Sequence, residues 1–231
     1  MIDKKNPLLE LIKLSQTLAK GEINLGKVGR WASFNPDQRR GQTTLQHSFS
    51  ICLLATTIID ALRPYYPKLD GELLLRAFVV HDWGEGENGR DKPAPEKTTT
   101  DDLAEYQSFV DSFSSIKNFD SLHRAFLLQY CYNYEDLINH AGFSKLASEI
   151  LIRLVTNNYY EGIIFRIIEI WEYLIYGLEM YYDFSNSEII KEVIHNNLKK
   201  LDLYAEIVTG FKERIYTEEI RTALCELEKT L

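Results

Sequence analysis

Apolar residues recur along most of this chain at intervals of three and four, which is the spacing of helices with one buried face. Alternating patterns typical of strands are too short to build a sheet, and Gly and Pro separate the helical stretches. The pattern predicts helices at about 7–20, 44–62, 71–82, 101–115, 119–140, 144–157, 163–182, 186–199 and 217–230. The longest predicted loop runs from Gly84 to Thr100. Because no repeat or linker interrupts the pattern, we expect residues 1–231 to form one all-α domain.

The helix predicted at 71–82 is apolar on nearly every face, which is typical of a central, buried helix. His81 and Asp82 close it, and Gly84 and Gly86 come after them. Neighbours on a regular helix point about 100° apart, so both side chains reach one ion only where the helix ends. An imidazole nitrogen and a carboxylate oxygen together suit a divalent transition ion such as Mn, Fe, Co, Ni or Zn. The pair is therefore a candidate metal site, with the glycines ending the helix.

His47 is a candidate third ligand. Thr43 and Gln46 have the spacing of a capping box, which places His47 in the first turns of the helix at 44–62. A lone His near an apolar face is more often structural than a ligand, so the assignment depends on its neighbours in space.

The apolar stretch at 163–182 carries one polar stripe with spacings of three and four. The stripe consists of Arg166, Glu169, Glu172, Tyr173 and Tyr176. It has two interpretations: the wall of a site, or a solvated face with an ion pair between Arg166 and Glu169. Four charges within the stretch argue against a membrane span, because each is costly in hydrocarbon.

Composition and charge narrow the function classes. Hydrophobic residues make up 45% and charged residues 26%, as in ordinary globular proteins. A net charge of −8 argues against long nucleic acids as partners, although a local basic pocket still suits a phosphate. Three scattered Cys predict reduced thiols, and the N-terminus lacks the apolar run of a signal peptide. We therefore expect a cytoplasmic protein without a membrane partner.

Together these residues resemble the HD-domain metal-dependent phosphohydrolases, most closely the bacterial 5′-deoxynucleotidase branch. The family signature is a His, a later His-Asp pair and a distant Asp. The branch adds an Arg-Trp before the first His, a Glu-His-Ser-like triplet, a Glu three residues after His-Asp, and a Gly-Asp before a loop with Pro and Lys. The matching segments, between roughly Lys27 and Tyr182, are Arg30-Trp31, Gln46-His47-Ser48, His81-Asp82, Glu85 and Asn88-Gly89-Arg90-Asp91-Lys92-Pro93, with Arg90 as an inserted residue.

The resemblance implies a single HD-type helical bundle with a metal at its centre. Its motif-bearing core would span about 27–182, with a helical C-terminal extension. One divalent transition ion (Mn, Co, Fe, Ni or Zn) would be held by His47, His81, Asp82 and Glu169, with Glu169 where the family has Asp. Two-metal members have extra His before the last ligand. His123 and His140 lie in that interval, but no flanking motif supports them, so we expect one ion.

The resemblance also assigns roles around the metal. Glu85 or Asp91 would handle the proton, and Arg30 would neutralise phosphate. Trp31 would form a flat wall against a sugar or base, and Lys92 and Lys97 add cations. Without the resemblance, the two acids are as often loop-solvating or turn-capping residues, and a lone Trp is more often a core anchor.

The expected function is hydrolysis of phosphate monoesters, above all (deoxy)nucleoside 5′-monophosphates. One alternative is an HD hydrolase for nucleoside triphosphates or phosphodiesters. Another is a nucleotide-binding module that retains its metal without turnover, which the Glu at position 169 allows. A small nucleotide is thus the expected partner, and a homodimer is compatible with the family.

Overall fold

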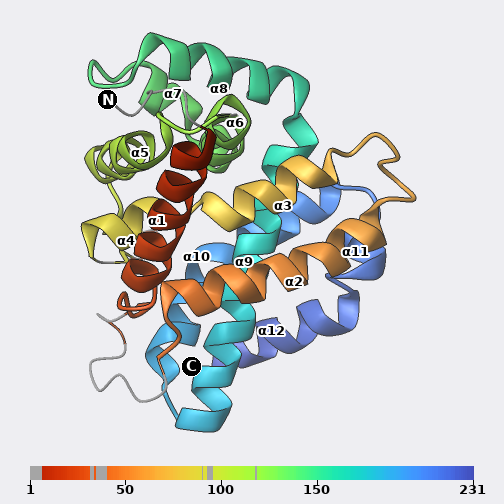
Figure 1. Ribbon diagram of the computed structural model, residues 1–231. Helices are drawn as coiled ribbons and strands as arrows, with labels where there is room; N and C mark the ends of the chain where they lie inside the picture. Colours follow the sequence, from red (N-terminus) through yellow and green to blue (C-terminus); the bar gives the residue numbers. More distant parts are fainter. Residues whose placement is uncertain (1–6, 32–33, 35–40, 90, 93–95, 118) are drawn as a thin grey trace, which may run out of the picture.

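The structure, a computed structural model, describes residues 7–31, 34, 41–89, 91–92, 96–117 and 119–231. Its regular elements are helices, which confirms the all-α prediction (Figure 1). They are α1 (Pro7–Leu25), α2 (Thr44–Leu62), α3 (Gly71–Val80), α4 (Trp83–Asn88), α5 (Thr99–Phe113), α6 (Phe119–Leu128), the 3-10 helix η2 (Gln129–Tyr132), α7 (Tyr134–Ile138), α8 (Lys145–Asn157), α9 (Tyr159–Phe184), α10 (Ser187–Ile207), α11 (Phe211–Arg214) and α12 (Glu218–Thr230). Within the described segments, extended pairing is limited to one isolated bridge between Gly29 and Thr43.

Helix α9 runs through the middle of the molecule (Figure 1) and packs against α2, α3, α8, α10 and η2. It is longer than the predicted 163–182, because it continues to Phe184 and ends at Ser185 in the left-handed conformation. Ile164, Ile167, Ile168 and Ile170 are fully buried on it. The central position explains why this stretch is apolar on most of its circumference.

Two helices that deliver predicted site residues pack against α9. Helix α2 begins at the predicted capping box, in which Gln46 N donates to Thr43 Oγ1 at 3.2 Å and Thr43 N to Gln46 Oε1 at 2.9 Å. In α3, Phe78 is fully buried and stacks on Phe165 of α9 with ring centroids 4.4 Å apart. The expected burial of α3 is confirmed in part: Leu73, Leu74, Ala77, Phe78 and Val80 are buried, whereas Val79 is 60% exposed.

The helix predicted at 119–140 is wrong in one respect, because it is divided into α6, η2 and α7. The break comes where Gln129 turns inward and donates from Nε2 to the backbone oxygens of His81 and Phe126. Tyr130 is also turned inward and donates from its hydroxyl to the backbone oxygen of Asp102 at 3.2 Å. These tertiary hydrogen bonds outweigh the local helical pattern and bring η2 against α9.

The loop predicted from Gly84 to Thr100 contains the short helix α4, which ends at Gly89 with φ 75°. Gly84 and Gly86 do not end a helix. A Cβ at Gly84 would lie 2.5 Å from Glu105 Cα, and one at Gly86 would lie 2.9 Å from Leu25 Cδ2. The two glycines therefore allow α4 to pack closely on α5 and α1.

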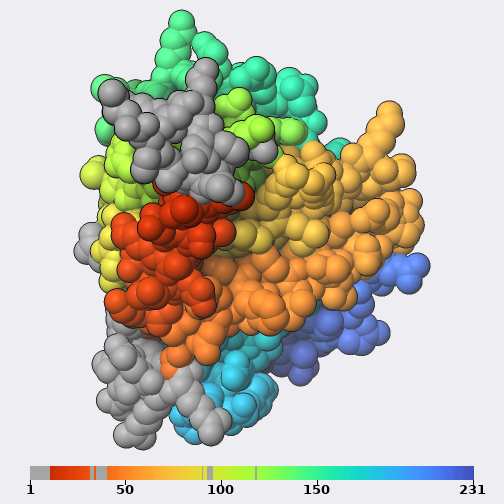
Figure 2. Space-filling model, in the orientation of Figure 1, coloured from red at the N-terminus to blue at the C-terminus, as the bar shows by residue number. Residues whose placement is uncertain are grey.

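Helix α2 lies along the surface of the face shown in Figure 2. Among the described helices, only α2 is long and apolar enough to cross a membrane by length and composition, with 33% of its apolar window buried. Phe49 and Leu53 on its outer side are 68% and 58% exposed. The core helices of soluble proteins meet the same criterion, so it carries little weight.

Candidate functional site

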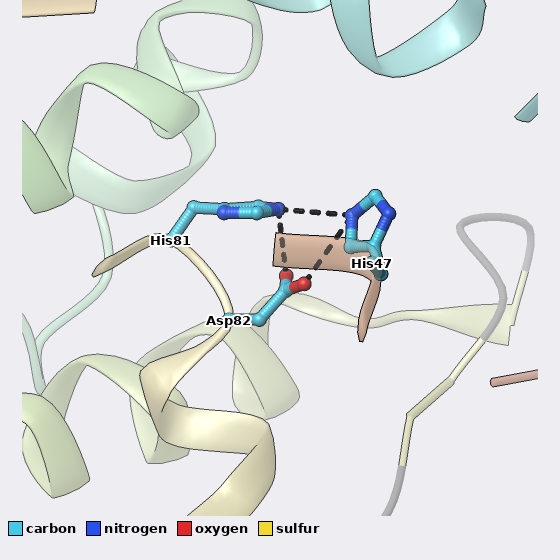
Figure 3. A group of neighbouring side chains, drawn as sticks. All are labelled: His47, His81 and Asp82. Carbon is cyan, nitrogen blue, oxygen red and sulfur yellow. Dashed lines mark hydrogen bonds and ion pairs between the residues drawn. The ribbon is translucent and has the colours of Figure 1, made fainter. Parts of the chain in front are cut away.

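Three predicted metal ligands meet in space. His47 comes from the first turn of α2, while His81 and Asp82 lie between α3 and α4 (Figure 3). The Nε2 atoms of His47 and His81 are 3.3 Å apart. Asp82 places Oδ2 3.4 Å from His47 Nε2 and Oδ1 3.1 Å from His81 Nε2. Among the described residues, these form the group of His, Cys, Asp and Glu side chains suited to a metal, with ligand atoms within 4.8 Å of one another.

The end of α3 lets adjacent residues point to one place, as the sequence predicts. His81 caps α3 with helical backbone angles, and Asp82 has φ −91° and ψ 7°, outside the helical repeat. Gln129 Nε2 donates to His81 O at 3.0 Å. The Gln129 side chain therefore pairs with the His81 carbonyl, which has no helical partner because α3 ends here.

The outer nitrogens of both imidazoles lie close to oxygen acceptors. His81 Nδ1 lies 2.9 Å from the Phe78 carbonyl oxygen, which only accepts, so Nδ1 carries the hydrogen. His47 Nδ1 lies 3.0 Å from Glu172 Oε1, a contact that favours a hydrogen on Nδ1 in the same way. Both Nε2 lone pairs then face each other and the Asp82 carboxylate. Three electron-rich atoms at these distances repel one another unless a proton or a metal cation lies among them, so the donor set fits a metal ion.

Electrostatics at the cluster also favour a cation. Burial lowers the pKa of His81, but the Asp82 carboxylate and, more weakly, Glu169 outweigh it, and the pKa of His81 is raised. Burial likewise raises the pKa of Asp82, but the charges of His81, His47 and Arg30 outweigh it and hold the pKa of Asp82 well below its usual range. Asp82 is therefore ionised at neutral pH, as a ligand must be.

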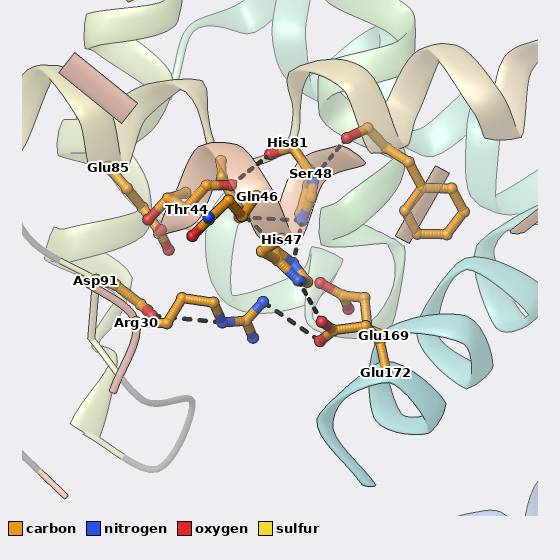
Figure 4. Close-up of polar contacts among 12 residues, drawn as sticks. Arg30, Thr44, Gln46, His47, Ser48, His81, Glu85, Asp91, Glu169 and Glu172 are labelled. Atoms are coloured by element: carbon orange, nitrogen blue, oxygen red, sulfur yellow. Dashed lines mark hydrogen bonds and ion pairs between the residues drawn. The ribbon is translucent and has the colours of Figure 1, made fainter. Parts of the chain in front are cut away.

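Glu172 links His47 to Arg30. Its Oε2 lies 3.3 Å from Arg30 Nη1, while Arg30 Nε lies 3.8 Å from Asp91 Oδ2 (Figure 4). Burial raises the pKa of Glu172, but Arg30 and His47 outweigh it and lower the pKa to about 2. Arg30 is only 4% exposed and lies over the Tyr173 ring at 5.1 Å. Arg30 thus lines the pocket while its charge is shared by two carboxylates.

Glu169, the expected fourth ligand, lies beside Glu172 on α9 but outside the three-residue group (Figure 4). Its Oε2 accepts a hydrogen bond from Arg166 Nη1 at 2.9 Å. Arg166, Glu169 and Glu172 are 7%, 6% and 4% exposed, so the polar stripe is not a solvated face. The stripe is the wall of a buried pocket, and Arg166 holds the Glu169 carboxylate within it.

Glu85 and Asp91 both face this pocket, and neither is simply a solvated loop residue. Burial and then the Asp82 and Asp91 charges raise the pKa of Glu85 well above its usual value. Burial also raises the pKa of Asp91, although Arg30 acts in the opposite direction. Asp91 Oδ2 accepts the Trp31 backbone N–H at 3.2 Å. A raised pKa is the shift expected of carboxyl groups that act as acids or bases in a site.

Lys97 connects Glu85 to an acid that the sequence interpretation did not single out. Its Nζ lies 3.7 Å from Glu85 Oε1 and 2.7 Å from Glu105 Oε2. Burial raises the pKa of Glu105 to about 7, with Lys97 opposing it. Glu105 shares the buried face of α5 with Tyr106 and Phe109, so its presence on an apolar face is the signal that would have found it.

The predicted substrate-binding residues differ in their burial and in their ion pairs. Trp31 is 5% exposed, has φ 51°, and packs on Tyr173 with ring centroids 5.6 Å apart, so it is both a buried anchor and a pocket wall. Lys92 lines the same pocket, but its Nζ lies 2.6 Å from Asp101. Both loop lysines are therefore paired with carboxylates. Arg90 lies outside the described residues.

The pocket around the cluster carries mixed charge. Its described walls include four cations (Arg30, Lys92, Lys97 and Arg166) and five carboxylates (Asp82, Glu85, Asp91, Asp102 and Glu169). The remaining described lining residues are Trp31, His47, Gln129, Tyr130, Tyr132 and Tyr173. Sequence reasoning assigned no role to Gln129, Tyr130, Tyr132 or Asp102, because the end of α6 that brings the η2 residues inward is a tertiary feature.

The two further histidines lie outside this site. His123 is buried, and its Nε2 lies 3.1 Å from the Tyr106 hydroxyl. His140 Nδ1 accepts a hydrogen bond from Gly142 N at 3.1 Å. Within the described part of the chain neither joins a group suited to a metal.

Comparisons with protein-family models, curated proteins and solved structures found no match to this chain. Its function is therefore inferred from the geometry of this site and from the motifs of the sequence.

Proposed function

We propose that this chain is a metal-dependent phosphohydrolase that converts (deoxy)nucleoside 5′-monophosphates to nucleoside and phosphate. One observation carries the proposal: the Nε2 atoms of His47 and His81 and the carboxylate of Asp82 converge within 3.4 Å, with both Nδ1 atoms held from behind. His47, His81 and Asp82 would hold one divalent transition ion, with Glu169 in the same pocket as a further oxygen donor.

The charge of the pocket supports a phosphate monoester as substrate. A bound divalent ion would supply a nucleophile at neutral pH and polarise a phosphoryl oxygen. The described walls carry five carboxylates and four cations. The two positive charges of a bound divalent ion would therefore change the formal charge of these walls from negative to positive. A dianionic phosphate group balances that charge better than a polyanion does, since the surrounding chain has a net charge of −8.

The chain's own residues provide the remaining chemistry. Glu85 and Asp91, with raised pKa values, are placed to take or return a proton at their carboxyl oxygens. Arg30 fixes Asp91 and Glu172 and presents its guanidinium to the pocket. Trp31 and Tyr173 form an aromatic wall that excludes water and suits a sugar or base.

The test combines metal content with a substrate panel. Purified protein is loaded with Mn, Co, Fe, Ni or Zn, and hydrolysis of nucleoside 5′-mono-, 3′-mono- and triphosphates and of dinucleotides is measured. We expect about one metal per chain, with 5′-monophosphates as the best substrates. His81→Ala and Asp82→Ala should lose both metal and activity, whereas the control His195→Ala, at an exposed position on α10, should keep both.

Two results contradict the proposal in different ways. Full metal occupancy in His81→Ala or Asp82→Ala would show that these residues do not hold the metal. Faster cleavage of triphosphates or dinucleotides than of 5′-monophosphates, with the same metal, replaces the nucleotidase by a phosphohydrolase of larger substrates.

A further inference from the structure

A second pocket adjoins the candidate site on the side of α10. It shares four walls with the first pocket and adds four residues from α10. The shared walls are Trp31, Tyr132, Arg166 and Tyr173, and the α10 residues are Glu192, Asn196, Asn197 and Lys200. Because the same side chains face both spaces, a molecule whose phosphate lies at the metal cluster extends directly into this α10 pocket.

The α10 residues are polar side chains on the inner part of an otherwise amphipathic helix. Asn197 is 7% exposed, and its Nδ2 donates to Val193 O at 3.0 Å. The Asn196 amide donates to Glu192 O at 2.9 Å and also contacts the Glu192 carboxylate. Both residues line the α10 pocket. Among the described residues the side-chain oxygens of Asn196 and Asn197 have no hydrogen-bond donor, so they can accept a hydrogen bond from a ligand.

The opposite walls are flat and aromatic. Trp31 and Tyr173 form one pair, and Tyr132, which is 54% exposed, stands at the open side with the Arg166 guanidinium 4.9 Å from its ring centre. Aromatic faces and a guanidinium plane favour a planar ring between them. Lys200 supplies a further donor at the rim of the pocket.

These features together select a class of ligand. A planar heterocycle with both donors and acceptors at its edge satisfies the amides and stacks on the aromatic walls. A sugar alone covers less of the aromatic wall, and a second phosphate would face the Glu192 carboxylate as well as Lys200. We propose that the α10 pocket binds the nucleobase of the substrate, and that Asn196 and Asn197 determine which base is preferred.

This inference rests on the proposed function, because it treats the α10 pocket as the place of the leaving group. It concerns residues beyond the segment in which the sequence resembles the HD phosphohydrolases, so that resemblance does not supply it. The consequence is a preference for one base, which a phosphate site alone does not provide. Hydrogen bonds to the polar edge of a substrate discriminate strongly, because a substrate that lacks this edge leaves the protein groups unpaired.

The experiment separates base recognition from phosphate chemistry. The kcat/KM for the four deoxynucleoside 5′-monophosphates is compared with that for deoxyribose 5-phosphate, which has the phosphate and sugar without the base. Asn196→Ala and Asn197→Ala should each lower kcat/KM for the preferred nucleotide about 10-fold and leave deoxyribose 5-phosphate within about 2-fold, as expected for a lost hydrogen bond. Lys199→Ala, an exposed neighbour on the same helix, is the control and should change neither substrate.

Binding gives a second measurement that does not need turnover. Titration calorimetry with free deoxynucleosides, in the presence of a chelator, should show weaker binding of the preferred nucleoside to Asn196→Ala. This variant is chosen because Asn196 is only partly buried, so that its replacement should leave the fold intact. If neither substrate is hydrolysed with any metal but this nucleoside binding is lost in the variant, the proposed function fails and base recognition stands. If nucleotides are hydrolysed and the ratio of the two substrates is unchanged in both variants, the inference fails and the function stands. If Lys200→Ala weakens nucleoside diphosphates far more than monophosphates, the pocket holds a second phosphate and the inference is overturned.

Discussion

Replacement of Glu172 by Gln tests whether the site is organised from behind the group of His47, His81 and Asp82. Glu172 contacts His47 Nδ1 at 3.0 Å and Arg30 Nη1 at 3.3 Å. Glutamine keeps the shape of the side chain and removes the charge, so it weakens both contacts without creating a cavity. We expect the His47 ring to lose its fixed orientation and Arg30 to lose one of its two buried counter-charges.

The magnitude follows from the pKa of Glu172, which falls from an ordinary 4.5 to about 2. A carboxyl whose pKa is lowered on folding stabilises the protein above its unfolded pKa, and this contribution is lost as the pH falls through the folded pKa. Since one pKa unit corresponds to about 1.4 kcal/mol, the ionised Glu172 contributes up to about 3 kcal/mol at pH 7. The difference between the wild type and Glu172→Gln should therefore be largest above pH 4.5 and shrink toward pH 2.

The assay has two parts. The free energy of unfolding is measured by urea denaturation in the presence of a chelator, so that metal binding does not enter the comparison. Metal affinity is then measured at pH 7, where a lost partner of a ligating imidazole should weaken binding about 10- to 100-fold. Glu179→Gln, at an exposed position on the same helix, is the matched control. Unchanged stability together with unchanged metal affinity in Glu172→Gln would refute this account of the site.

Two further predictions concern the acids on the other side of the cluster. Glu85→Gln should lower turnover about 100-fold, while elemental analysis should find the metal still bound. Glu96→Gln, at an exposed position, is the control. Loss of metal in step with activity would make Glu85 a ligand or a folding residue. The pKa of Glu105 is raised from 4.5 to about 7, so its contribution to stability is complete below 4.5 and is lost as the pH rises through 7. The wild type should accordingly lose on the order of 1–3 kcal/mol relative to Glu105→Gln between these pH values, and parallel stability curves in urea denaturation would contradict the burial of an acid here.

The parts of the site that the sequence predicts correctly depend on local signals. The Thr43 and Gln46 capping box determines where α2 begins, and this places His47 one turn into the helix. The end of α3 is predicted to within two residues, at the His-Asp pair where its apolar run stops, although the glycines expected to end the helix lie inside α4. In both cases the interactions that decide the structure lie within a few residues of each other, so a sequence pattern contains them.

The parts that it misses depend on contacts between distant residues. The division of the helix predicted at 119–140 follows from a hydrogen bond between Gln129 and His81, which are 48 residues apart. Helix α4, which carries Glu85, packs on α5 at Gly84, where a Cβ would lie 2.5 Å from Glu105 Cα. The conformation of Trp31, with φ 51°, coincides with the hydrogen bond from its N–H to Asp91, 60 residues away. No local propensity predicts such contacts, because they are determined by how helices pack.

The two acids on α9 illustrate how packing divides roles that sequence alone leaves ambiguous. Glu169 and Glu172 are one turn apart and equally buried, yet Arg166 holds Glu169 while Arg30 and His47 hold Glu172. Glu172 contacts the outer nitrogen of the His47 imidazole, so it orients that ring. Glu169 is held by Arg166, which also lines the α10 pocket. If Glu169 turns to a bound metal, the Arg166 guanidinium is freed toward the substrate, so on this geometry the metal and the leaving group are linked through one arginine.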